Sequence, residues 1–214
     1  MARLLPVDPR APEREALEEA AAHLRLGQLV GMPTETFYGI AADALSGAAV
    51  GRVFALKGRP PELPLPVIVD SLEMLEGIAE LPPVDRRLAE EFWPGPLSLI
   101  LAAKEIVPEN LTGGTGKVAA RVSSHPVAGG LAAALGGPIT ATSANLSGRP
   151  GLSSASEVER DLGHGLALIL DGGRLVARTG STLLDVTVSP PRLVRPGLVP
   201  EELIRQYLAK LHSA

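Results

Sequence analysis

Short apolar runs alternate with helical segments along this chain, and glycine or proline separates most of them. The apolar runs predict strands at 28–32, 65–69, 97–102, 118–122, 139–142, 166–170, 181–188 and 192–194. Helical spacing and capping residues predict helices at 12–26, 48–56, 71–79, 85–92, 125–135 and 201–211. A capping box of Ser156 and Glu159 predicts one more short helix. Because strands and helices interleave from end to end, we expect an α/β fold in which helices cover a sheet.

Length and composition favour one domain. Hydrophobic residues make up 45% of the 214 residues, which is ample for a core. Glycine and proline contribute 23 and 20 residues, which excludes a helical bundle. No shift in composition and no repeat of 20–50 residues marks a boundary. We therefore expect a single domain over residues 1–214, with its core at about 10–200 and a C-terminal helix at about 201–211.

Charge and residue usage exclude several classes of function. The net charge of −4 gives no general attraction to nucleic acid or to an anionic membrane. Aromatic residues make up only 3%, too few for a base-stacking surface. The absence of cysteine excludes disulfides and thiolate metal sites, and the four histidines show no metal-ligand spacing. With no signal peptide and no apolar run near the roughly 20 residues of a membrane span, we expect no membrane association and a cytoplasmic location.

A glycine-rich stretch at 113–117 resembles a P-loop only superficially. The P-loop pattern requires a glycine five positions before Gly116 and a hydroxyl residue after Lys117, but Leu111 and Val118 stand there. The backbone N–H groups of this stretch could still bind phosphate. Whether it closes over a ligand as a lid is left open by the sequence.

The stretch 32–66 joins a predicted strand, a hydroxyl-rich turn and a helix that ends in two cations, Lys57 and Arg59. Hydroxyls and closely spaced cations suit a ligand that carries both an amino-acid head and phosphates. The alternative is a solvated helix end, where cations interact favourably with the helix dipole.

Four further polar residues are candidates for binding. Arg121 lies inside an apolar strand, where it either faces solvent or pairs with a carboxylate, such as that of a ligand. Ser143 and Asn145 follow a strand, where such residues cap turns and where ligands bind in open α/β sheets. Arg195 precedes a Pro-Gly pair and is either a surface charge or a phosphate ligand.

Eight short motifs occur in a fixed order along the chain. They are PTETFYGIAADA (33–44), FALKGRP (54–60), FWPGPLSLIL (92–101), VAARVSSHPVA (118–128), PITATSANLSGRP (138–150), DGG (171–173), STLLD (181–185) and LVRPG (193–197). Each is weak alone, but the ordered series is specific, and the resemblance covers about residues 10–200. The series resembles the YrdC family, the threonylcarbamoyl-AMP synthases of tRNA modification. Longer members carry an additional C-terminal domain, so this chain resembles the short, single-domain form.

The resemblance implies a fold and a reaction. The fold would be a YrdC-like twisted open mixed sheet, flanked by helices around a concave ligand site. L-threonine, bicarbonate or CO2, and ATP would give threonylcarbamoyl-AMP and pyrophosphate, the first step of N6-threonylcarbamoyladenosine formation in tRNA. Downstream enzymes would transfer the group to tRNA. Such chemistry needs positioning and charge neutralisation more than a side-chain nucleophile.

The resemblance also implies where each substrate binds. The threonine site would comprise Thr34, Pro66, Arg121, Ala141 and Ser181, with Arg121 binding the carboxylate. The ATP site would comprise Lys57, Arg59, Pro61, Lys117, Ser143, Asn145, Gly151 and Arg195. Lys57 and Arg59 would also be catalytic, because they would face the triphosphate and stabilise the charge that develops during transfer. Mg²⁺ would arrive with ATP and keep several waters, so no residue is assigned as a metal ligand.

One position departs from the family pattern. Many relatives have Pro-Leu-x-Val-His-Val after the Lys-x-Arg motif, and Ile68 occupies the histidine position here. We therefore expect that the reaction requires no proton transfer by a histidine at this position.

Two alternatives to the synthase differ in class. The first is a non-catalytic RNA-binding module, in which Lys57, Arg59, Lys117 and Arg195 would bind RNA or tRNA weakly. The second is a carbamoyl-transfer domain of hydrogenase maturation, which shares the Lys-x-Arg and Ser-x-Asn motifs. Those domains belong to much longer chains that contain cysteine, which is absent here.

Overall fold

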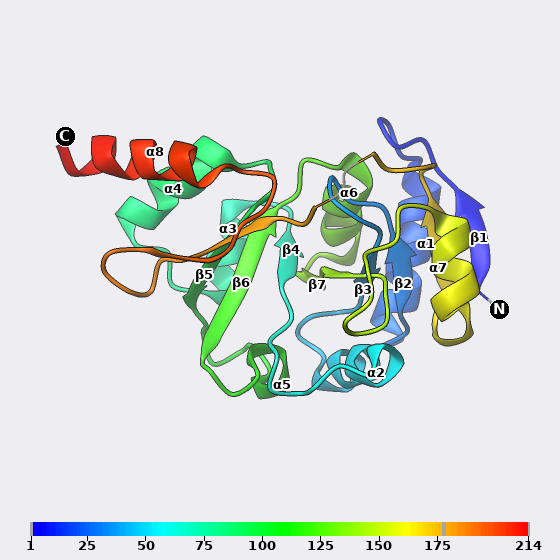
Figure 1. The fold of residues 1–214 in the computed structure, drawn as a ribbon. Helices are drawn as coiled ribbons and strands as arrows, with labels where there is room; N and C mark the ends of the chain where they lie inside the picture. Colours follow the sequence, from blue (N-terminus) through cyan, green and yellow to red (C-terminus); the bar gives the residue numbers. More distant parts are fainter. Residues whose placement is uncertain (1, 177–178, 214) are drawn as a thin grey trace.

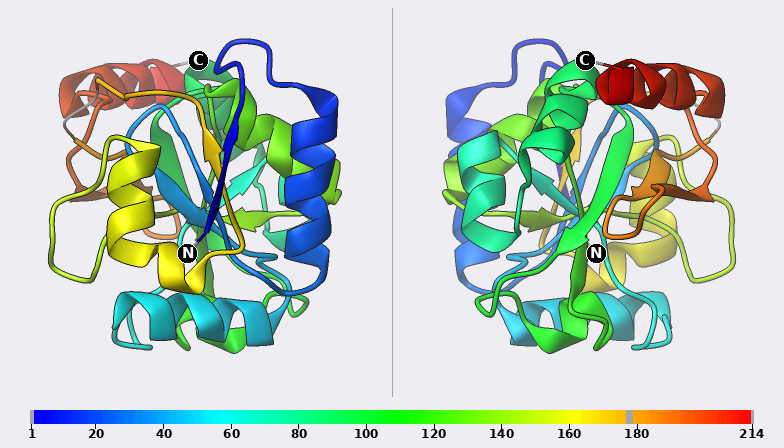
Figure 2. Two further views of the ribbon diagram at one scale, coloured as in Figure 1. Left: turned by 90° about the vertical axis from the view of Figure 1, so that its right-hand side faces the viewer. Right: turned by 90° about the vertical axis from the view of Figure 1, so that its left-hand side faces the viewer.

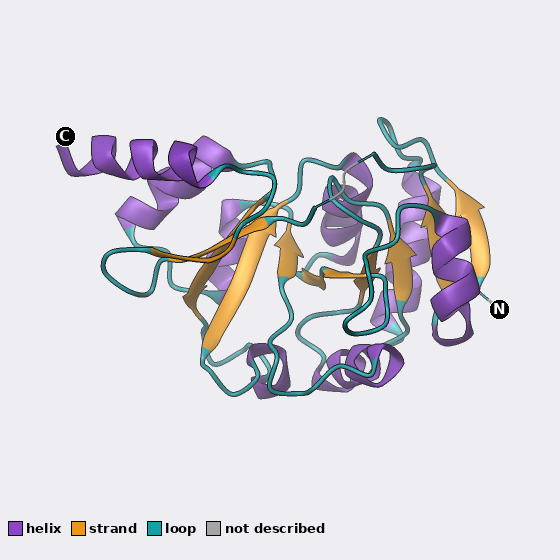
Figure 3. Ribbon diagram, viewed as in Figure 1, coloured by secondary structure: helices purple, strands orange, loops and turns teal. Residues whose placement is uncertain are grey.

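The computed structural model describes residues 2–176 and 179–213 of the chain. Two mixed sheets lie beside each other, and helices flank both of them (Figures 1 and 3). The predicted α/β fold class is confirmed, although the strands form two hydrogen-bonded sheets rather than one. Within the described part of the chain, no helix has both the length and the apolar character needed to cross a membrane.

The first sheet has five strands in the order β1-β9-β2-β3-β8. Their bounds are Arg3–Pro6 (β1), Leu168–Asp171 (β9), Val30–Met32 (β2), Gly39–Ala41 (β3) and Thr142–Ser143 (β8). The strands β1, β9 and β2 run parallel, whereas β3 is antiparallel to both of its neighbours. This arrangement places the loop between β2 and β3 at the end of β2, next to the site described below.

The second sheet has six strands in the order β11-β10-β5-β6-β4-β7. Their bounds are Arg192–Arg195 (β11), Thr182–Asp185 (β10), Leu97–Ala102 (β5), Lys117–Val122 (β6), Val67–Val69 (β4) and Ile139–Thr140 (β7). Parallel and antiparallel pairs alternate across it. The central strand β6 therefore carries both Lys117 and Arg121 between β5 and β4.

The chain passes from one sheet to the other at Ala141, which separates β7 from β8. The backbone N–H of Ala141 donates to the carbonyl of Pro66, with an N–O distance of 2.8 Å. The hydroxyl of Thr140 accepts from the Ala42 N–H and donates to the Ile40 carbonyl. These bonds hold the two sheets together where one continuous strand at 139–142 was predicted.

Eight α-helices are present in the described part of the chain. Their bounds are Arg14–Arg25 (α1), Gly47–Lys57 (α2), Leu72–Ile78 (α3), Pro83–Phe92 (α4), Glu109–Thr112 (α5), Pro126–Leu135 (α6), Ala155–Leu162 (α7) and Glu201–Ser213 (α8). Figure 2 shows α1 and α7 on opposite sides of the strands β1 and β9. Helix α8 packs on α4, where the rings of Phe92 and Tyr207 meet edge to face with their centroids 5.8 Å apart.

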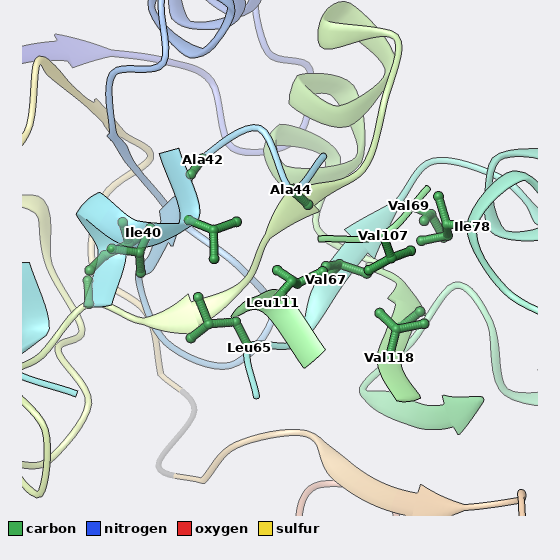
Figure 4. Close-up of a cluster of buried hydrophobic side chains, with 14 of the residues drawn as sticks. Ile40, Ala42, Ala44, Leu65, Val67, Val69, Ile78, Val107, Leu111 and Val118 are labelled. Carbon is green, nitrogen blue, oxygen red and sulfur yellow. The ribbon is translucent and has the colours of Figure 1, made fainter. Parts of the chain in front are cut away.

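Buried apolar side chains form two clusters. The larger cluster runs between the sheets and includes Ile40 from β3, Val67 and Val69 from β4, and Val118 from β6 (Figure 4). The smaller cluster lies between α1, α6 and the first sheet, and it includes Ile68. Side chains alternate along a strand, so Ile68 points to the opposite face from Val67 and Val69. Ile68, at the position where the resemblance implied a histidine, is therefore a core residue in this chain.

Several sequence predictions were wrong in detail. Strands β1 and β3 and helix α5 were not predicted, because each is too short to show a period. The capping box was predicted at Ser156 and Glu159, but it is formed by Ser154 and Glu157. Both pairs have the required spacing, and the helix begins at Ala155 because the chain is still extended at Ser154.

Candidate functional site

Two neighbouring cavities open beside Arg59, one where the two sheets meet and the other over the second sheet. The first compartment has a volume of about 230 Å³ and is lined by Thr34, Thr36, Phe37, Gly39, Arg59, Pro66, Arg121, Ala141, Thr142, Ser143, Thr179, Gly180, Ser181, Arg195 and Pro196. The second compartment has a volume of about 330 Å³ and is lined by Arg59, Pro64, Pro66, Ser98, Ile100, Thr115, Lys117, Ala119, Leu183, Asp185, Arg192, Val194 and Arg195. Arg59, Pro66 and Arg195 line both compartments. A ligand could therefore extend from one compartment into the other.

A hydroxyl turn after β2 forms one wall of the first compartment. The Thr34 hydroxyl donates to the Phe37 carbonyl at an O–O distance of 2.7 Å and accepts from the Thr36 N–H. This local bonding explains why a Thr-x-Thr sequence makes a tight turn directly after a strand. The turn leaves Thr34 buried but in contact with the compartment.

Arg121 lies on β6 and is paired with a carboxylate. Its Nε donates to Oε1 of Glu35 at 2.8 Å, and the Ser123 hydroxyl donates to Oε2 of the same carboxylate. Burial acts to raise the pKa of Glu35, but the charge and hydrogen bonds of Arg121 and Ser123 outweigh it and lower that pKa. The carboxylate therefore stays ionised beside the guanidinium.

Two more guanidinium groups lie near Arg121. Arg195 donates to the carbonyl of Ser181 at 2.9 Å and to its hydroxyl at 3.2 Å. Burial lowers the pKa of Arg195, and the nearby charge of Arg121 lowers it further. The pKa of Arg59 is lowered in the same way, by burial and by Arg195. Three cations this close favour an anionic ligand in the cavities.

The second compartment contains an ion-paired carboxylate. Nζ of Lys117 lies 3.2 Å from Oδ2 of Asp185, and Arg192 lies 3.6 Å from the same oxygen. Burial acts to raise the pKa of Asp185, but hydrogen bonds from Thr187 and Lys117 lower it overall. Lys117 is thus held at the cavity wall with part of its surface exposed.

Gly58 separates the two cations of the Lys-x-Arg motif. It ends α2 in the left-handed conformation, with φ of 59°, a geometry that glycine adopts without strain. Lys57 on one side of it donates to the carbonyls of Ser143 and Asn145. Arg59 on the other side donates to the carbonyls of Leu63 and Pro64 and reaches both compartments.

Lys57 is buried, with only 2% of its surface exposed. Burial and the neighbouring Arg59 lower its pKa to about 7. Its bonds and those of Asn145 hold the loop after β8 in place, because the Asn145 amide donates to the carbonyls of Leu146 and Arg149. Ser143, at the start of this loop, lines the first compartment.

The structure brings most of the predicted site residues together. The first compartment gathers Thr34, Arg59, Pro66, Arg121, Ala141, Ser143, Ser181 and Arg195, and the second adds Lys117. Four predicted residues line neither compartment, namely Lys57, Pro61, Asn145 and Gly151. Of these, Gly151 packs against Phe37, which does line the first compartment. The binding roles assigned to all of these residues stay predictions.

Sequence reasoning missed the acidic partners, Glu35 and Asp185. Each lies far along the chain from its cation, since Glu35 and Arg121 are 86 positions apart and Lys117 and Asp185 are 68 positions apart. The only local signal was an acidic residue at a strand end, which is also a common surface feature. Within the described residues, no three histidine or acidic side chains are grouped closely enough to hold a metal ion.

Comparison with known proteins identifies the family. A protein-family model for Sua5, YciO and YrdC proteins, with the description "Telomere recombination", matches residues 22–197. The chain belongs to the Sua5/YciO/YrdC family. The resemblance seen in the ordered motifs is therefore confirmed.

Two relatives and one solved structure show how close this family member is to known proteins. It is 43% identical over 204 residues to a threonylcarbamoyl-AMP synthase of Pyrococcus abyssi, covering 92% of this chain but only 60% of the relative. It is 38% identical over 202 residues to a putative threonylcarbamoyl-AMP synthase of Mycobacterium tuberculosis, covering 94% and 92% of the two chains. The crystal structure of P. abyssi Sua5 complexed with L-threonine matches with a TM-score of 0.91 and 42% identity, covering 95% of this chain and 60% of that one.

Proposed function

We propose that this protein synthesises threonylcarbamoyl-AMP from L-threonine, bicarbonate or CO2, and ATP, and releases pyrophosphate. The observation that carries this proposal is the pair of compartments that share Arg59 and Arg195, one of them containing Arg121. The names of the relatives and the L-threonine in the P. abyssi complex support it. In this proposal the product passes to enzymes that complete N6-threonylcarbamoyladenosine in tRNA.

In this proposal the first compartment holds the amino acid. Its volume of about 230 Å³ suits a small ligand. The terminal nitrogens of Arg121 bind the threonine carboxylate, since a guanidinium matches a carboxylate in two parallel hydrogen bonds. Thr34 and Ser181 offer hydroxyl oxygens to the amine and the β-hydroxyl group.

The second compartment holds the nucleotide in this proposal. Lys117, Arg192 and the two shared arginines supply positive charge for a triphosphate. Arg59 and Arg195 lie where the compartments join, so they contact the α-phosphate region next to the amino acid. Ser143, which lines the first compartment, contributes a hydroxyl to the nucleotide site in this proposal.

The reaction then needs no side-chain nucleophile. The threonine amine bonds to the carbon of CO2 and loses a proton, which gives a carbamate. A carbamate oxygen attacks the α-phosphorus of ATP, and the bond from that phosphorus to the bridging oxygen of pyrophosphate breaks. The contribution of the chain is to hold the reactants together and to stabilise negative charge with Arg59 and Arg195.

The side chains present fit a Mg²⁺ ion that arrives on the nucleotide rather than a resident ion. Asp185 is the one carboxylate lining the described part of the second compartment, and it already accepts from Lys117 and Thr187. Phosphate oxygens and water would therefore supply most ligands of the ion. When bound, Mg²⁺ neutralises phosphate charge.

A pyrophosphate-release assay tests the proposal. We expect release only when L-threonine, bicarbonate and ATP are present together, and a product with the mass of threonylcarbamoyl-AMP. Release with ATP alone, or no release at all, contradicts the proposal. Release that requires carbamoyl phosphate instead of threonine indicates the carbamoyl-transfer alternative. Tight, salt-dependent RNA binding without turnover indicates the RNA-binding alternative.

A further inference from the structure

The ion pair between Glu35 and Arg121 lies directly behind the first compartment. The side chain of Arg121 is 3% exposed and that of Glu35 is 11% exposed. Both carboxylate oxygens accept a hydrogen bond, one from Nε of Arg121 and the other from the hydroxyl of Ser123. Glu35 itself does not line the compartment, whereas Arg121 does. The carboxylate therefore acts on a ligand through Arg121 and not by contact.

The bond at Nε determines which part of the guanidinium remains for a ligand. A guanidinium has five N–H donors in a planar fork. Glu35 accepts from Nε, and within the described residues no hydrogen bond is formed by either terminal nitrogen of Arg121. A guanidinium can bind a carboxylate through two bonds at its terminal edge or at the side edge that includes Nε, and Glu35 occupies Nε. Glu35 thus leaves the terminal edge available.

Glu35 also controls the charge of this region. Arg121, Arg195 and Arg59 lie close enough for each to affect the next, as the lowered pKa values of Arg195 and Arg59 show. Among the described residues, Glu35 is the one carboxylate paired with any of these three arginines. Without it, Arg121 would be free to turn away from Arg195.

The same residue connects both walls of the compartment. Glu35 lies between Thr34 and Thr36 in the hydroxyl turn, and its carboxylate is bonded to Arg121 and Ser123 in and after β6. The distance from the Thr34 hydroxyl to the guanidinium therefore depends on this ion pair. Replacing both members of a buried ion pair by apolar residues is often neutral for stability, whereas removing one member alone is destabilising.

We propose that Glu35 is the positioning residue of the amino-acid compartment, which fixes Arg121 so that its terminal nitrogens face the substrate carboxylate. This inference rests on the proposed function. A purely structural role, in which the pair only fastens the turn to β6, predicts a different experimental result.

The test compares Glu35→Gln and Glu35→Ala with the wild-type protein. Glutamine keeps the shape of the side chain and one acceptor oxygen but removes the charge, so it serves if Glu35→Ala fails to fold. Glu80→Gln is the matched control, since Glu80 is exposed and lines neither compartment. Calorimetry measures the binding of L-threonine and of L-threoninamide, which lacks the carboxylate. Steady-state kinetics give KM for L-threonine and for ATP.

We expect the Kd and KM for L-threonine to rise about tenfold or more in both Glu35 variants, as for a lost charge-assisted contact. KM for ATP should change less than about twofold in the same variants. The preference for L-threonine over L-threoninamide should shrink, because that preference measures recognition of the carboxylate. Glu80→Gln should match the wild type in every measurement.

Other results would overturn the inference about Glu35 or contradict the proposed function. Unchanged or tighter binding of L-threonine in folded Glu35 variants overturns the inference, as does an unchanged preference over L-threoninamide. A lower melting temperature with both KM values unaltered assigns Glu35 a structural role only, which also overturns it. A wild-type protein that does not bind L-threonine contradicts the proposed function itself, and the two failures are thereby distinguished.

Discussion

Lys57 shows how one side chain can matter for a site that it does not line. Its Nζ donates to the carbonyls of Ser143 and Asn145, and Ser143 lines the first compartment. The Lys57→Ala variant should stay folded, with an unfolding free energy lower by about 1–3 kcal/mol, because two buried carbonyls lose their donor. Turnover should fall by about a hundredfold, as expected when reacting groups are displaced.

Urea unfolding and the pyrophosphate assay check this prediction. Lys104→Ala is the control, since Lys104 is an exposed lysine that also donates to a backbone carbonyl, that of Glu76. It should keep normal turnover. Near-normal turnover in Lys57→Ala would remove Lys57 from the catalytic residues.

Lys57 should also make stability depend on pH. Its pKa is lowered by burial and by Arg59 from 10.5 to about 7 in the folded protein. Between these two values the unfolded chain binds a proton that the folded chain does not, so the free energy of unfolding rises with pH. Between pH 7 and pH 9, the wild type should therefore gain stability relative to Lys57→Met in urea unfolding. A stability difference that does not change over this range would contradict the lowered pKa.

Arg121 is expected to determine the requirement for threonine. Arg121→Ala should raise KM for L-threonine before it affects KM for ATP, because the carboxylate loses its partner. It also leaves Glu35 buried without a cation, which should cost about 3–5 kcal/mol of stability. In the double variant Glu35→Gln/Arg121→Met, stability should recover while threonine binding does not. Normal KM for L-threonine in Arg121→Ala would refute the carboxylate assignment.

At the scale of elements, the site depends on the close approach of the segment after β11 to the start of β10. A Cβ at Gly197 would lie 2.4 Å from backbone atoms of Ser181 and Thr182, closer than real contacts allow. Gly197→Ala should therefore displace Ser181 and Arg195, lower stability and raise KM for L-threonine.

Gly51→Ala is the control, because a Cβ there meets nothing within 4 Å inside α2, and it should stabilise the protein by about 0.5–1 kcal/mol. Thermal unfolding and the pyrophosphate assay distinguish the two variants, and equal behaviour would contradict the close-approach argument.

The elements also show where sequence reasoning succeeds and fails. Helices such as α1 and strands such as β5 were predictable because their apolar residues follow a clear period and their ends carry caps or breakers. Strands β3 and β8 have three and two residues, too few for any period. They form because neighbouring strands offer hydrogen bonds, and a local pattern does not contain that information.

At the scale of the whole molecule, the sequence by itself determined the α/β class and the ordered motifs of the family, and most of the site residues that it predicted line one of the two compartments. Local periodicity, capping and motif order are properties of neighbouring residues, so they can be read along the chain. Only the tertiary structure decided that the strands form two sheets joined at Ala141, with Glu35 paired to Arg121 and Asp185 to Lys117. The physical reason is distance along the chain, since the energies of such pairs depend on burial and geometry that exist only after the sheets have assembled.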